Sequence, residues 1–144
     1  MDRARATTHF LLRVVSGFLF MHHGGQKLFG WFGGIPPAGG PAPLWSQAGI
    51  GGALEFFGGI LILLGLFTRP AAFVLAGEMA VAYFQFHQPK GLVPLQNHGE
   101  GAVLYCFIFL FFAAWGAGPW SLDALRARRK EPPEARRAAL GLGL

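Results

Sequence analysis

The first long apolar stretch of the chain, residues 10–25 (FLLRVVSGFLFMHHGG), contains an arginine near its start. A charged side chain inside an apolar helix is costly unless it meets polar partners. Spacings of four and three residues place that arginine on one helical face with two glycines, a phenylalanine and a lysine: Arg13, Gly17, Phe20, Gly24 and Lys27. We therefore expect this face to point toward the rest of the chain, while the other faces meet an apolar environment.

The composition indicates that this environment is a membrane. Hydrophobic residues make up 53% of the 144 residues and charged residues only 13%, about half the charged fraction of soluble domains. Four apolar runs are close to the length that crosses a hydrocarbon core about 30 Å thick, the last being slightly short: 7–25, 46–67, 71–87 and 101–117. The predicted fold is all-α, an integral membrane four-helix bundle over residues 1–125, multi-pass in the inner (plasma) membrane.

The basic residues indicate how the bundle is oriented. With both termini in the cytoplasm, two basic residues, Lys27 and Lys90, lie on the outer side. Nine lie on the cytoplasmic side: Arg3, Arg5, Arg69, Arg126, Arg128, Arg129, Lys130, Arg136 and Arg137. The positive-inside rule favours this orientation. We expect residues 126–144 to form a basic, mobile cytoplasmic tail, which begins within a short helix capped by Ser121 and Asp123 and ending at Lys130.

Ionisable residues inside the predicted spans fall into two groups when depth is estimated from about 1.5 Å per residue. Arg13 and Glu78 come out in the inner half, where we expect a structural ion pair that holds the helices in register. The candidate ligand-binding residues lie in the outer half and at the outer mouth: His22, His23, Lys27, Glu55, His87, His98 and Glu100. The alternative is that this outer cluster is also only a structural ion pair.

Other kinds of site are disfavoured by the sequence. The single cysteine, Cys106, forbids an intrachain disulfide and a CxxC redox pair, and on an apolar helix it is expected to be an inert thiol. No tight spacing of ligand residues predicts a metal site. Haem held by His23 and His87 is a minority hypothesis without an attachment motif. The net charge of +5 comes without a basic groove in a soluble segment, so we expect no nucleic acid partner.

Several segments resemble the DoxX family. R-x3-G-x5-HG-x2-KL, from Arg13 to Leu28, is similar to the family's first-helix signature, and E-x2-GG-x5-LGL-x-TR-x-AA, from Glu55 to Ala72, is similar to its second-helix block. HGEGA-x2-Y and GAGPWSLDAL, over residues 98–105 and 116–125, resemble the last helix and its exit. The resemblance implies a small four-helix bacterial inner-membrane protein. Some members are subunits of a thiosulfate:quinone oxidoreductase, and others associate with superoxide dismutase and a sulfurtransferase in an oxidative-stress complex.

The residues and the resemblance together suggest a membrane subunit of a redox, oxidative-stress or sulfur-compound:quinone oxidoreductase complex. We expect its outer pocket to accept a quinone or a small anion through Lys27 and His23, with Glu55 orienting the histidine or accepting its proton. No covalently bound cofactor is expected. The competing hypotheses are a non-enzymatic small-molecule transporter and a membrane scaffold for soluble partners. The sequence leaves the redox partner proteins, a homo-oligomer and a catalytic role open.

Overall fold

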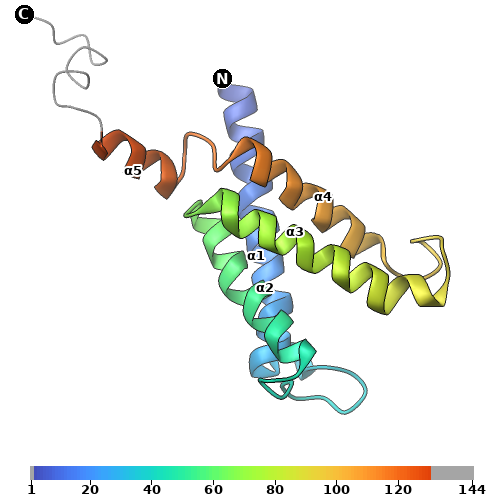
Figure 1. The fold of residues 1–144 in the computed structure, drawn as a ribbon. Helices are drawn as coiled ribbons and strands as arrows, with labels where there is room; N and C mark the ends of the chain where they lie inside the picture. The colour runs from blue at the N-terminus through green and yellow to red at the C-terminus, as the bar shows by residue number, and fades with distance from the viewer. Residues whose placement is uncertain (1, 131–144) are drawn as a thin grey trace, which may run out of the picture.

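The computed structural model describes residues 2–130 and is all-α, with no strand in that range. Five α-helices are joined by loops and short helical turns, as Figure 1 shows. The helices are α1 (Arg3–Phe29), α2 (Gln47–Leu64), α3 (Thr68–Ala82), α4 (Glu100–Trp115) and α5 (Leu122–Lys130). The turns are η1 (Trp31–Gly33), the π-helical turn η2 (Tyr83–His87) and η3 (Gln88–Lys90).

Helices α1 and α2 form a closely packed hairpin because glycines line their contact. A Cβ atom on Gly17 would lie 2.5 Å from the backbone nitrogen of Leu63, and one on Gly24 would collide with the backbone of Phe56. Small residues at such positions let membrane helices approach until their backbones touch. The predicted inward-facing stripe of α1 is therefore confirmed, and α2 is its partner.

Helices α3 and α4 form the second hairpin, around the main apolar core. Leu75, Ala76 and Met79 of α3 pack against Phe109 and Phe112 of α4 in a buried cluster that also contains Phe20 of α1. Large hydrophobic side chains are exposed on all four long helices in far greater number than those that are buried. Contiguous apolar surface of this extent is typical of a protein that lies in lipid.

The two hairpins are joined at one end, which we call the closed end, and diverge from it in Figure 1. Both carboxylate oxygens of Asp123 accept hydrogen bonds at the start of α3, from the backbone nitrogens of Phe67 and Thr68, each at 2.9 Å. The backbone nitrogen of Asp123 donates to the carbonyl of Gly65 at 2.8 Å. The start of α5 is thus fixed to the α2–α3 turn.

The capping prediction for α5 is half confirmed. Ser121 accepts from the backbone nitrogen of Ala124 at 3.1 Å and so caps α5. Asp123 instead caps α3, because the α2–α3 turn leaves two backbone donors facing it. The predicted tail, 126–144, begins inside α5, since residues 126–130 are helical, and residues 131–144 lie outside the described part of the chain.

Helix lengths differ from the predicted spans. Helix α1 extends beyond 7–25 at both ends, and α2 ends before residue 67 because Gly65 adopts a left-handed conformation, with φ of 65°. Within residues 2–130, only α2 is both long and apolar enough to cross a membrane by length and composition alone. Helix α4 is apolar but shorter.

Candidate functional site

A cavity of about 900 Å³ lies between the two hairpins on the side away from the closed end. All four long helices contribute to its wall, together with η2 and the loops that follow α1 and precede α4. Apolar side chains form most of the wall, and the ionisable ones are His23, Lys27, Glu55, Glu78, His87, His98 and Tyr105. Five of the seven predicted ligand-binding residues therefore meet in one cavity.

Lys27 and Glu55 form an ion pair across the α1–α2 hairpin, with 2.5 Å between Nζ and Oε1. The close approach at Gly52, where a Cβ atom would lie 2.7 Å from the Cβ of Lys27, brings the lysine onto α2. The Glu55 side chain is only 3% exposed, and its second oxygen, Oε2, is buried without a hydrogen-bond partner. Glu55 thus holds the lysine with one oxygen, while the protein encloses the other without a hydrogen-bond partner.

Glu78 brings a second carboxyl group to the cavity from α3. Its Oε1 atom lies beside Gly51, one helical turn before Glu55 on α2, and its Oε2 atom is buried without a partner. The sequence placed Glu78 in an ion pair with Arg13. The structure instead assigns it to the cavity, facing the same segment of α2 as Lys27.

Arg13 does not pair with Glu78, and the predicted structural ion pair is wrong. Arg13 is 1% exposed, and its guanidinium donates to the carbonyls of Ile62 at 2.8 Å, Leu63 at 2.6 Å and Trp120 at 2.7 Å. The last carbonyls of a helix lack partners within the helix, and a guanidinium offers several donors in a fixed fork. Arg13 therefore fastens the end of α2 to the turn before α5.

The estimated depths of Arg13 and Glu78 were counted from the start of each helix, as if all helices began at one level. Helix α1 is longer than predicted and does not begin at the level of the others. Its first turns project past the closed end in Figure 1, so Arg13 lies level with the last turn of α2. Glu78 lies level with Gly51, roughly 17 Å further along α2 at 1.5 Å per residue. Along the hairpin, the two side chains are therefore separated by more than half the length of α2.

His87 is held in one orientation by the loop that precedes α4. Its Nδ1 lies 3.1 Å from the carbonyl of Asn97, and since a carbonyl only accepts, Nδ1 carries the proton and Nε2 of the neutral ring is an acceptor. The buried Asn97 in turn donates to the carbonyl of Gly91 at 2.7 Å and accepts from Gly99 at 2.8 Å. Nothing in the sequence marks Asn97 as important, because a single asparagine in a polar loop is ordinary.

His22 and Glu100 do not line the cavity. The Nδ1 atom of His22 lies 2.7 Å from the carbonyl of Phe18, and its ring packs against Phe18 and Phe32. Glu100 is exposed in the first turn of α4. The sequence alone cannot show which of the neighbouring histidines 22 and 23 faces inward. In the structure His23 lines the cavity.

At the cavity mouth, Gln47 of α2 donates to Gln85 of η2, so the hairpins touch again there.

Residues 8–88 match the family model described as DoxX. The chain belongs to the DoxX family. The match covers α1 from residue 8 onward, α2, α3 and η2, and with them Lys27, Glu55, Glu78 and His87. The main polar groups of the cavity thus lie within the DoxX segment, while His98 lies outside it.

Two curated proteins are similar to this DoxX protein over most of its length. An uncharacterized protein of Haemophilus influenzae is 43% identical over 119 residues, which cover 78% of this chain and 85% of that one. An uncharacterized membrane protein of Mycobacterium tuberculosis is 31% identical over 137 residues, covering 82% and 80%. No solved structure matches the chain. Family and relative together identify a membrane protein, in agreement with the exposed apolar surface.

The cavity of this DoxX protein combines a cation with several proton acceptors. Lys27 has three N–H donors, of which the ion pair with Glu55 engages one. The free oxygens of Glu55 and Glu78 and the Nε2 atom of His87 are acceptors. Such a set can hydrogen-bond a ligand that carries oxygen atoms and can take up or give up protons beside it.

Proposed function

We propose that this DoxX protein binds the head group of a quinone in the cavity between its hairpins, as the membrane subunit of a redox complex. The observation that carries the proposal is the partly buried Lys27–Glu55 pair, which faces the carboxyl of Glu78 inside a largely apolar wall. Ligand sites of this size are typically apolar with a few convergent polar groups. A quinone ring has the matching character, an apolar body with a carbonyl oxygen at each end.

The charges of the cavity favour a neutral ligand over a small anion. Lys27 is already paired with Glu55, and Glu78 adds a second carboxyl group on the facing wall. An anion placed there would lie beside the Glu55 carboxylate, which already engages Lys27, in a poorly solvated space, and this is unfavourable. A neutral carbonyl oxygen needs only a donor, and the ammonium of Lys27 has two that the ion pair does not use.

The proposed roles follow from these contacts. Lys27 donates to one carbonyl oxygen of the ring, and Glu55 holds the lysine in place. Glu78 and His87 accept hydrogen bonds from the hydroxyl groups of the reduced ligand and exchange protons with them. When bound, a quinone supplies two-electron, two-proton redox chemistry. This chain has one cysteine, so the electrons must come from a partner protein of the redox or sulfur-oxidising type.

The same proposal includes four membrane crossings. Helices α1, α2 and α4 provide three, and α3 with η2 and η3 continues in helical geometry from Thr68 to Lys90 and provides the fourth. The basic residues Arg3, Arg5 and Arg13 in the first half of α1, Arg69 at the start of α3 and those of α5 lie toward the closed end, whereas Lys27 and Lys90 lie toward the other end. By the positive-inside rule the closed end is cytoplasmic and the cavity opens toward the outer leaflet.

The test is titration calorimetry of the purified protein with duroquinone, a quinone head group without a tail, in a mild detergent. Replacing both members of the pair, Lys27→Met with Glu55→Gln, removes the donor without leaving an unpaired charge. Because a hydrogen bond from a charged group contributes about 1.5–3 kcal/mol, affinity should fall about tenfold to a hundredfold. Lys90→Met is the matched control, since Lys90 is exposed and does not line the cavity.

A second variant tests the acceptor side. Glu78→Gln replaces one carboxyl oxygen with an NH2 donor. It should weaken binding of duroquinol more than binding of duroquinone, because only the reduced ligand donates hydroxyl protons. Glu100→Gln, an exposed glutamate away from the cavity, should change neither. Absence of duroquinone binding, or equal losses in Lys90→Met and the double variant, would refute the proposal and favour the transporter or scaffold hypothesis.

A further inference from the structure

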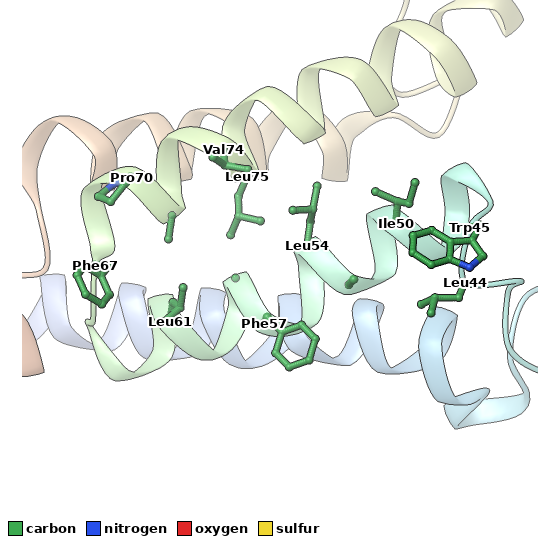
Figure 2. Close-up of a pocket in the computed structure, with 13 residues that line it drawn as sticks. Leu44, Trp45, Ile50, Leu54, Phe57, Leu61, Phe67, Pro70, Val74 and Leu75 are labelled. Carbon is green, nitrogen blue, oxygen red and sulfur yellow. The ribbon is translucent and has the colours of Figure 1, made fainter.

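A second hollow, a groove of about 710 Å³, lies between α2 and α3. Figure 2 shows its side chains: Leu54, Phe57 and Leu61 come from α2, and Val74 and Leu75 come from α3. Trp45 stands at one end and Phe67 at the other. Every lining side chain is aliphatic or aromatic, and the indole nitrogen of Trp45 is the single polar side-chain atom among them.

The groove and the polar cavity share part of their wall. Ile50 and Leu54 of α2 and Val74 of α3 line both hollows. All three side chains are exposed, so the two spaces meet along the edge of the α2–α3 contact. A molecule with its polar head in the cavity and its apolar tail in the groove would pass these three residues.

We propose that the groove holds the isoprenoid tail of the quinone whose head group occupies the cavity. This inference rests on the proposed function and makes the substrate class more specific: a long-tailed membrane quinone that enters sideways from the bilayer between α2 and α3. From Ile50 to Leu61 the groove follows α2 for roughly 17 Å, which accommodates several isoprene units. A freely soluble quinone without a tail would leave this surface unused.

The groove orients the tail more than it increases affinity. Lipid chains are as apolar as the groove, so moving a tail from the bilayer into it gives little hydrophobic gain, and packing contacts provide what remains. An affinity series with increasing tail length is therefore a weak test. The informative measurement is the position of the tail in the bound state.

The experiment uses a ubiquinone analogue with a diazirine at the second isoprene unit and the full-length protein in lipid nanodiscs. After irradiation, peptide mass spectrometry should find adducts on the groove segments around Phe57 and Leu61 of α2 and around Val74 of α3. Excess duroquinone should reduce this labelling at least fivefold, because it removes the head group from the cavity and the tail leaves with it. A phospholipid with a diazirine on its acyl chain is the control, and duroquinone should not displace its adducts.

A filled groove gives an independent readout. Ala53→Phe places a large ring among the groove side chains and should redirect tail labelling while duroquinone affinity stays within twofold. Leu11→Phe, on an exposed position of α1 outside both hollows, should change neither. If groove adducts form but persist under excess duroquinone, or appear away from α2 and α3, the tail assignment is refuted. Failure of duroquinone itself to bind refutes the proposed function instead, so the two failures are distinguishable.

Discussion

Removing one member of the Lys27–Glu55 pair should have unequal consequences. The Glu55 side chain is 3% exposed and that of Lys27 is 30% exposed. Lys27→Met leaves a buried carboxylate without its cation, whereas Glu55→Gln leaves a lysine that still reaches the cavity mouth. The stability cost should therefore be larger for Lys27→Met, and a simple count of lost contacts would not predict this asymmetry.

The magnitude follows from the burial of the pair. Breaking a fully buried pair from one side costs about 3–5 kcal/mol, and partial exposure of Lys27 reduces this to about 2–3 kcal/mol. For a chain of this size the melting temperature should fall by roughly 6–12 °C. Glu55→Gln should cost about 1 kcal/mol, comparable with one lost hydrogen bond.

The assay is a thermal melt of each purified variant in the same detergent, followed by circular dichroism. The double variant, Lys27→Met with Glu55→Gln, should melt above Lys27→Met alone, because no charge remains unpaired. Lys90→Met serves as the control for loss of an exposed lysine. Equal melting temperatures for the two single variants, or a double variant that is less stable than either, would refute the reasoning.

Three further predictions concern the closed end and the topology. Arg13→Met should destabilise the protein by about 3 kcal/mol because three carbonyls lose their buried donor. Arg13→Lys should recover less than half of that loss, and Glu78→Leu should not rescue Arg13→Met in thermal melts. Asp123→Ala should cost about 1–2 kcal/mol in the same assay by removing the cap of α3, and Asp2→Ala, the cap of an exposed helix end, should cost clearly less. Reporter fusions at Arg69 and after Leu144 should read cytoplasmic and those within residues 36–42 or 90–96 external; an external reading at Arg69 would contradict four crossings.

The sequence predicted the helices and the face that α1 turns inward. Charged residues and glycines repeat at helical spacing from Arg13 to Lys27. Because charged side chains are costly in an apolar environment, this face must point toward the other helices. The same reasoning placed Lys27 and Glu55 together, since both project inward from the outer half of their helices. The spacing of residues along each helix and the apolar environment were sufficient for these inferences.

The sequence did not predict the partners of Arg13. Side-chain charges can be read from a sequence, but backbone carbonyls are present at every residue and become acceptors only where a helix ends. The end of α2 at Gly65 and the turn before α5 supply them here. The divergence of the two hairpins, which creates the cavity and places Glu78 in its wall, depends on packing between distant segments and has no local signature either.

The central claim is that a quinone head group occupies the cavity between the hairpins, and filling that cavity tests it most directly. A Cβ atom on Gly51 would point toward Glu78, with its Oε1 at 3.1 Å, so Gly51→Leu extends a side chain into the cavity. A Cβ on Gly77 of α3 meets nothing within 4 Å, and Gly77 lines neither hollow, so Gly77→Leu is the matched control. Calorimetry should show duroquinone binding to the unchanged protein and to Gly77→Leu with the same affinity, and at least tenfold weaker binding to Gly51→Leu. Equal affinities for all three proteins would place the quinone outside the cavity and contradict the account.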